Sequence, residues 1–527
     1  MQYTKNSFLK RLSAVLLALL LGLPLVFVQA ETVKDSLSVG VISSKTTKLM
    51  PLLPEDRDFV SLYGLVYESL LRIGDNGLPE PYLAKDIDNV GGNTLNFEIR
   101  DDVNFSNGQK LTAYDIAASG NFILERAKNE EGLPQGHYSL MRYNIKSFQA
   151  TSETQLTVLT ERPYFISLYS LTFPVVPANQ VQQENPAGSG PYVIDQFEPG
   201  KSLWLKANAS WWKQHPQVET ILVSFYQNTK KLVSDFEYGR LDTAITRSLA
   251  AAQYKSGVGV LSLPYRTNQL EVLLLNNNEY RLKDAEARRA IMKAIDLNAI
   301  GNRVFAGRVS RAYTPFPSAS FMYADLDSYY QYNLEEARQT LENLGWNDND
   351  DDGILDKIDE EGNLANFALR LLVYEDPENS VRYETALRIK SMLERLKISV
   401  RIELKSIDQV HTHLQAHSFD MALVAFQMDD AFDPGFLLMS SNAKVGNFGR
   451  YKSKKMDTLM AEYREQTGLS EIAYKGQEIQ LQFTEDLPFI PLFYRMGSML
   501  TRKVFTNARD IRENSVFRGI EEFNIKK

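Results

Sequence analysis

Stretches in which apolar and polar side chains alternate recur along most of this chain, and segments with helical periodicity separate them. The clearest alternating stretches are Ser36–Ile42, 94–100, Gln155–Thr160 and 269–275. Alternation with a period of two residues, combined with β-branched side chains, predicts strands that pack one face against a core. Strands that alternate with helices over several hundred residues predict an α/β fold.

Three segments have apolar residues at helical spacing, namely 284–297, 334–344 and 380–396. In the first of these, Ala287, Ile291 and Ala294 fall on one face, and Asp284 is the predicted N-cap. The chain has no repeat period and no Gly/Ser-rich linker. We therefore expect lobes that exchange chain segments rather than separate domains joined by linkers.

The composition is that of a large globular protein without thiols. At about 150 residues per domain, the 527 residues suggest three or four domain-sized units. An aromatic content of 11% excludes a disordered chain. The absence of cysteine excludes disulfides, thiolate metal sites, cysteine nucleophiles and anchoring through a lipidated cysteine. A formal net charge of −8, without basic clusters, argues against a nucleic-acid partner, which would require a positive face.

Residues 1–30 have the features of a secretory signal peptide. Lys5, Lys10 and Arg11 precede the apolar run 12–28, and small residues before position 31 predict cleavage after Ala30. The apolar run is just long enough to span a bilayer, so an uncleaved membrane anchor is the alternative. Both possibilities predict an extracytoplasmic protein, in the periplasm or on the outer face of the cell membrane.

A series of short motifs extends across almost the whole chain after residue 30. In order, they are VYESLL at 66–71, GLPEPYLA at 77–84, GSGPY at 188–192, RRAIMKAID at 288–296, GW at 345–346 and PFIPLFY at 488–494. The series resembles the family 5 extracellular solute-binding proteins, which are the peptide-, dipeptide- and nickel-binding subunits of ABC importers. The resemblance implies an α/β, two-lobed fold like that of the type II periplasmic binding proteins, with an extra domain.

The resemblance also implies boundaries for these parts. Lobe I would comprise 31–70, 185–263 and 495–527, the extra domain 71–184, and lobe II 264–494. The implied function is capture of a peptide or similar small solute between the lobes and its delivery to an ABC permease in the membrane. The protein would act as a monomer, without a required cofactor and without nucleic acid.

Paired acids follow a predicted buried strand at 421–425. Carboxylates at the C-terminal end of a strand in an α/β lobe lie where ligands usually bind. Peptide-binding family members read W-x-x-D-Y-x-D-P here, and the first Asp holds the peptide α-ammonium. This chain has Phe426 in place of Trp and one extra residue before Asp433, so the equivalent acid is either Asp429 or Asp430. Alternatively, the acids only cap the end of the strand.

Four further residues are candidates for the ligand site. The resemblance implies that Glu68 faces the cleft, although a position toward solvent is the alternative. The aromatic side chains of Phe426 and Tyr494 are expected to line the pocket. Asn276 belongs to the same matched series and is included as a candidate ligand contact.

The acidic segment 348–359 has the spacing of a calcium-binding loop. Its candidate ligands are Asp348, Asp350, Asp352, Asp356 and Asp359, with Gly353 at the sixth position. Oxygen ligands at alternate positions can wrap a hard cation, and the glycine permits the sharp bend. The last ligand is Asp rather than Glu and reaches less far, so a solvated acidic turn is the alternative to calcium.

His411, His413 and His417 have a spacing that could hold zinc or nickel, but an exposed helix explains them more simply. No G-x-S-x-G, H-E-x-x-H or Gly-rich phosphate loop occurs in the sequence, which argues against an enzyme. Two alternatives to a peptide receptor stay open. One is a nickel, sugar or cofactor receptor on the same fold, and the other is a secreted carbohydrate-active enzyme that uses two acids.

Overall fold

The computed structural model describes residues 36–43, 47–54, 57–88, 92–129, 141–249, 251, 254, 259–358, 362–376, 380–503 and 511–520. The predicted signal peptide and Asp359 lie outside these residues. Within the described residues, none of the helices combines the length and apolarity needed to cross a membrane.

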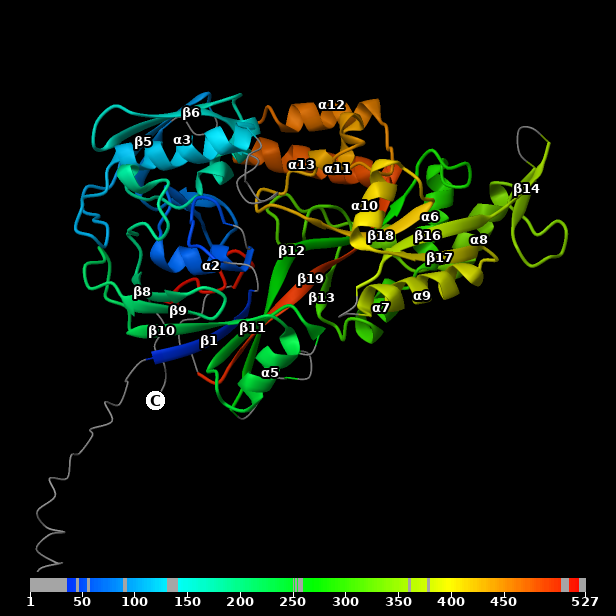
Figure 1. Ribbon diagram of the computed structural model, residues 1–527. Coiled ribbons are helices and arrows are strands. Elements are labelled where there is room, and N and C mark those ends of the chain that lie inside the picture. Colours follow the sequence, from blue (N-terminus) through cyan, green and yellow to red (C-terminus); the bar gives the residue numbers. More distant parts are fainter. Residues whose placement is uncertain are drawn as a thin grey trace, which may run out of the picture.

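One eleven-stranded sheet runs through the whole molecule (Figure 1). Its strands follow the order β17-β16-β18-β12-β19-β11-β1-β10-β9-β8, and β13 pairs with β19 in addition. In that order, the strands are β17 (Ser399–Lys405), β16 (Ala368–Tyr374), β18 (Met421–Gln427), β12 (Leu261–Leu275), β19 (Phe489–Thr501), β11 (Thr243–Thr246), β1 (Ser36–Ile42), β10 (Thr220–Tyr226), β9 (Ser202–Ala207), β8 (Tyr192–Glu198) and β13 (Val309–Arg311).

Two long strands at the centre, β12 and β19, connect the two halves of this sheet (Figure 1). The first part of β12 pairs with the end of β19, next to β11, whereas the part from Gln269 onward pairs with β18. The register between β12 and β19 shifts between Arg266 and Leu270. Such an irregularity bends the strands locally. The two halves of the sheet form the cores of two α/β lobes, which confirms the expected fold class.

Lobe II surrounds the β16–β18 half of the sheet with helices. These are α6 (Ala285–Ala294), α7 (Leu297–Arg303), α8 (Leu334–Asn343), α9 (Val381–Glu394), α10 (Ile407–Gln415), α11 (Gly435–Leu438), α12 (Lys454–Tyr463) and α13 (Leu469–Asp486). The helix predicted at 284–297 is two helices, because Asp296 turns the chain and caps α7 by accepting from the Ala299 N–H at 2.9 Å. Asp284 caps α6 as predicted.

Lobe I contains the other half of the sheet, with α5 (Thr229–Glu237) and α2 (Arg57–Val66) beside it (Figure 1).

The extra domain lies above this lobe in the same view and has its own sheet in the order β4-β5-β7-β6. Its elements are β4 (Ala84–Asp88), β5 (Thr94–Ile99), α3 (Ala113–Asn129), α4 (Met141–Asn144), β6 (Ile145–Ala150) and β7 (Gln155–Thr160). Two small hairpins complete the structure, β2 (Leu71–Ile73) with β3 (Pro79–Pro81), and β14 (Asp356–Ile358) with β15 (Leu364–Asn366). The residue boundaries predicted for the lobes stay a prediction.

Apolar side chains of the central strands supply the core at the junction. Leu270, Leu273 and Leu275 on β12 are completely buried, as are Ile490 and Tyr494 on β19. Burying one such leucine contributes roughly 1.5–3 kcal/mol. The strands that connect the lobes are therefore firmly packed on the lobe II side, and the site described next begins where this packing ends.

Candidate functional site

A tight loop leads the chain away from the end of β18. The Met428 N–H donates to the Asn268 carbonyl of β12 at 2.8 Å, and so extends the pairing by one residue. Phe432 then adopts a left-handed conformation with φ 51°, which is unusual for a bulky residue and stores local strain. Asp433 anchors the far end of the loop through a bidentate ion pair with Arg464, in which the two N–O distances are 2.8 and 2.9 Å. The loop is therefore held in one shape.

The two candidate acids on this loop point to different environments. Asp430 is half-buried, and its oxygens accept from the side-chain amides of Asn268 at 2.7 Å and Asn514 at 3.0 Å. It lines a cavity between the lobes. Asp429 does not line that cavity, and its buried Oδ1 accepts no hydrogen bond from any described residue.

The environment of Asp429 changes its acidity. Burial raises the pKa of the Asp429 carboxyl to about 7, and the nearby negative charges of Asp433 and Asp430 act in the same direction. The backbone N–H groups of Phe432 and Asp433 act in the opposite direction and lower the pKa. Asp429 is therefore expected to titrate near neutral pH.

The cavity between the lobes, here called the interlobe cavity, has a volume of about 770 Å³. Its wall is formed by the β2–β3 turn, the first half of β12, the segments 307–310 and 318–321, Asp430 and Phe432 after β18, Met496 on β19, and Ile511 and Arg512. Both lobes contribute to it, and it adjoins the register shift of β12. Its size is within the range of about 300–1,000 Å³ that is typical of small-molecule sites.

A second, smaller cavity of about 210 Å³ lies next to it and shares Ile73, Asp430 and Arg512 with the interlobe cavity. Glu68 lines this smaller cavity directly after α2. Its buried carboxylate accepts from the indole N–H groups of Trp211 at 3.0 Å and Trp212 at 2.9 Å. Burial raises the pKa of Glu68, whereas the indole hydrogen bonds partly lower it.

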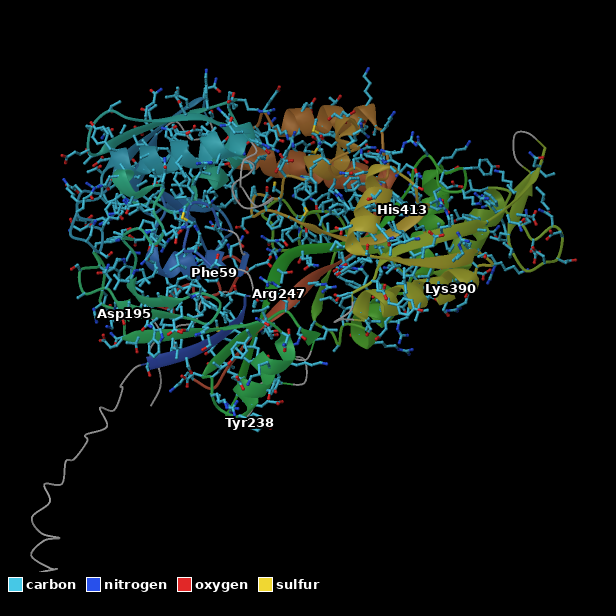
Figure 2. All side chains as sticks on the ribbon, in the orientation of Figure 1. Phe59, Asp195, Tyr238, Arg247, Lys390 and His413 are labelled. Atoms are coloured by element: carbon cyan, nitrogen blue, oxygen red, sulfur yellow. The ribbon has the colours of Figure 1, made fainter. Side chains whose placement is uncertain are left out.

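A C-terminal segment, 511–520, ties both lobes together at the cavity. The buried side chain of Glu513 forms an ion pair with Arg247 at 3.0 Å, and Arg247 lies near the centre of the molecule in Figure 2. The same carboxylate accepts from the Asn268 backbone N–H at 2.6 Å and from the Gln427 amide at 3.1 Å. One acid thus contacts lobe I, the connecting strand and the end of β18.

Comparison with known proteins identifies the family of this chain. The family model described as "Bacterial extracellular solute-binding proteins, family 5 Middle" matches residues 79–448, which is more than half of the chain. The chain belongs to family 5. The resemblance seen in the sequence motifs is therefore confirmed, and the protein is a solute-binding component of an ABC importer.

Relatives of this family 5 protein are distant in sequence but cover most of the chain. The oligopeptide-binding protein AppA of Bacillus subtilis (strain 168) is 24% identical over 485 residues, which is 88% of this chain and 87% of AppA. The nickel-binding protein NikA of Staphylococcus aureus (strain NCTC 8325 / PS 47) is 23% identical over 433 residues, 80% of this chain and 81% of NikA.

A solved structure of NikA from Brucella suis in complex with Fe(III)-EDTA superposes with a TM-score of 0.77 at 19% identity. It covers 93% of this chain and 100% of that chain. The solved structure supports the fold. Because these relatives are named for different solutes, the solute of this family 5 protein has to be argued from its own residues.

Three candidate ligand contacts lie away from both cavities. Phe426 packs against Phe436 and Phe448, with ring centroids 5.9 and 6.4 Å apart. The Tyr494 hydroxyl donates to the Pro315 carbonyl in the core. Asn276 donates to the Phe419 carbonyl at 2.9 Å and so links the end of β12 to the start of β18. All three have structural partners, and a ligand contact for them stays a prediction.

The acidic loop before β14 gathers three carboxylates. Asp348, Asp350 and Asp356 each place an oxygen within 4.8 Å of the others. Asp352 instead caps the turn by accepting from the Ile354 N–H at 2.7 Å. An ion pair of 2.5 Å with Lys397 occupies Asp348 and holds the pKa of that carboxyl below its usual value. Calcium binding by this loop stays a prediction.

Two of the three clustered histidines have local partners. A ring nitrogen of His413 contacts the Ser418 carbonyl at 3.2 Å, and one of His417 contacts the Phe448 carbonyl at 3.0 Å. Among the residues that the structure describes, these histidines form no group that could hold a metal ion together. The arrangement agrees with the interpretation of α10 as an exposed helix.

Proposed function

We propose that this protein captures a small peptide, or a similar solute with both a positive and a negative group, in the interlobe cavity. The observation that carries the proposal is the cavity itself. It lies between the two lobes, and its wall includes two carboxylates, Asp75 and Asp430, and three arginines. A zwitterionic solute can satisfy both kinds of charge with charge-assisted hydrogen bonds. No histidine lies among the described residues of the wall, which disfavours direct coordination of nickel there.

Binding would act through closure of the two lobes. The lobes are connected through β12 and β19, and the shift in their register lies beside the cavity. A solute that contacts both walls stabilises the closed form in proportion to its preference for that form. Closure would then present the loaded protein to a membrane permease.

Asp430 is proposed to hold the positive end of the solute. Its two oxygens each accept one amide hydrogen bond, and a carboxylate has about four acceptor sites, so an ammonium group can still be bound. Asp429 is one residue away but does not line the cavity. The chain therefore contains its own matched control.

The test begins with a tripeptide library. Members that stay bound to the protein after ultrafiltration would be identified by mass spectrometry, and the strongest would be titrated calorimetrically. We expect Asp430→Asn to lose at least ~30-fold in affinity, since removing a buried charge partner costs ~2–5 kcal/mol. N-acetylation of the peptide should weaken wild type similarly and should change Asp430→Asn little.

Asp429→Asn should bind the same peptide within about threefold of wild type. A loss of peptide affinity confined to Asp429→Asn would show that Asp429, and not Asp430, binds the ammonium group. Normal binding by both variants, or no penalty for acetylation, would contradict an ammonium anchor. Failure of the wild-type protein to retain any peptide would contradict a peptide solute.

The remaining aspects of the proposal concern location and state. We propose that the protein is exported with cleavage after Ala30, which N-terminal sequencing of protein from its own host would test. It is proposed to act as a monomer and to bind its solute without chemical turnover. These proposals rest on the basic and apolar residues of 1–30 and on the membership in a family of extracellular binding proteins.

A further inference from the structure

The interlobe cavity has more cationic than anionic side chains on its described wall. Its charged residues are Asp75, Arg266, Arg308, Asp430 and Arg512. The carboxylate of Asp75 already forms an ion pair with Arg518 at 3.0 Å, so its charge is balanced from outside the wall. Asp430 is then the described carboxylate of the wall that remains to face the guanidinium groups of Arg308 and Arg512.

The guanidinium group of Arg308 is fixed by neutral partners. It donates to the hydroxyl groups of Ser498 at 2.9 Å and Ser262 at 3.2 Å, and to the carbonyl oxygens of Ala251 and Tyr254 at 3.3 and 3.4 Å. Among the described residues, no carboxylate forms an ion pair with it. The planar guanidinium group is therefore held in place, while no carboxylate among the described residues neutralises its charge.

The other two arginines of the wall also contact uncharged groups. Arg512 donates to the backbone carbonyl of Asp75 at 2.6 Å and lines both cavities. The guanidinium carbon of Arg266 lies 5.3 Å from the ring centroid of Phe432 and 5.8 Å from that of Tyr494.

We infer that the solute of this cavity is anionic overall, and that a side-chain carboxylate of a small acidic peptide binds at Arg308 and Arg512. The inference rests on the proposed peptide-binding function and specifies its class of substrate. A peptide with one acidic side chain has one ammonium for Asp430 and two carboxylates for the arginines. The N–H groups of Arg308 and Arg512 that do not already donate can bind a carboxylate with charge-assisted hydrogen bonds, and closure of the lobes would strengthen these bonds by excluding water.

Matched peptides test this inference. In competition for wild-type protein, Ala-Glu-Ala should bind at least tenfold more tightly than Ala-Gln-Ala, which has nearly the same shape without the charge. Arg308→Gln should reduce that ratio to about one, and Arg308→Lys should leave an intermediate ratio. A merely structural role of Arg308 would weaken both peptides equally and leave the ratio unchanged, which would overturn the inference.

Two controls keep the result interpretable. Arg303→Gln alters an exposed arginine at the end of α7 and should leave the ratio as in wild type. If Arg308→Gln does not fold, Arg512→Gln tests the same wall and should also lower the ratio. Equal binding of the two peptides by wild type, or an unchanged ratio in a folded Arg512→Gln variant, would overturn the inference.

A non-peptide probe separates this inference from the proposed function. If no tripeptide binds, the peptide proposal fails, and the dicarboxylate glutarate then decides whether the wall binds anions. A rise in the melting temperature of wild type with millimolar glutarate that is absent in Arg308→Gln supports an anion site. No rise in wild type overturns it.

Discussion

Two adjacent carboxylates after β18 illustrate how strongly local surroundings determine the role of a residue. Asp430 accepts two amide hydrogen bonds at the edge of the interlobe cavity. Asp429 is half-buried, and its buried Oδ1 is without a described donor. Asp430 can hold a charged partner from solution, whereas ionisation of Asp429 destabilises the folded protein.

The raised pKa of Asp429 predicts a dependence of stability on pH. Its folded-state pKa of about 7 exceeds the ordinary value of 3.8, so the stability linked to its proton is complete below about pH 4. That stability is lost as the pH rises through 7. We expect the free energy of unfolding of Asp429→Asn, relative to wild type, to increase by roughly 2–3 kcal/mol between pH 5 and pH 8.

Urea unfolding at the two pH values measures this difference. Asp86→Asn changes an exposed aspartate on β4 and should follow wild type at both values. A constant difference between Asp429→Asn and wild type across the range would show that Asp429 ionises normally.

At this scale the sequence predicted the site only in part. The position of Asp429 and Asp430 after a buried strand was evident, but periodicity does not reveal which of two neighbours faces a cavity. Arg308 and Arg512 were missed because they lie in short connecting segments without a motif. Phe426 and Tyr494 are predicted to line the pocket, and that ligand contact stays a prediction; their rings pack within lobe II, where any large apolar side chain is stabilised.

At the scale of elements, the strands and most helices follow from the sequence pattern. The strand predicted at Ser36–Ile42 is β1, and the helix predicted at 334–344 is α8 within one residue. The predicted strand 269–275 is only the second half of β12, because its first half has less regular alternation around Pro264. The break between α6 and α7 was missed because apolar spacing continues through it, while capping by Asp296 decides the local geometry.

The acidic loop before β14 supports a prediction about calcium. Calcium should raise the melting temperature by mass action if Asp348, Asp350 and Asp356 bind the ion. The ion would have to displace the Lys397 ammonium from Asp348. We therefore expect a dissociation constant in the micromolar to millimolar range. Asp350→Ala should abolish the rise.

Melting curves with calcium, with magnesium and with chelator measure this effect. Asp325→Ala, which changes an acidic residue outside the loop, is the control and should keep the full response to calcium. Identical curves in all three conditions would leave only a solvated acidic turn.

At the scale of the whole molecule, two lobes share one sheet and enclose a cavity where its central strands change register (Figure 1). This arrangement follows from the exchange of segments between lobes, which the absence of a linker predicted. The C-terminal segment returns to the junction, where Glu513 contacts Arg247, Asn268 and Gln427. Pairing between residues so distant in sequence cannot be read from periodicity, so the role of this segment was not foreseen.

Capture of an acidic peptide in the interlobe cavity is tested by identifying the solute that the protein retains when it is purified under native conditions from its own host. Mass spectrometry of the molecules released on denaturation should find small peptides with an acidic side chain, in near-stoichiometric amount. The double variant Asp430→Asn with Arg308→Gln, purified in the same way, should release none. Recovery of a metal chelate, a sugar or no solute from wild type, or of the same peptides from the double variant, would contradict capture of an acidic peptide at Asp430 and Arg308.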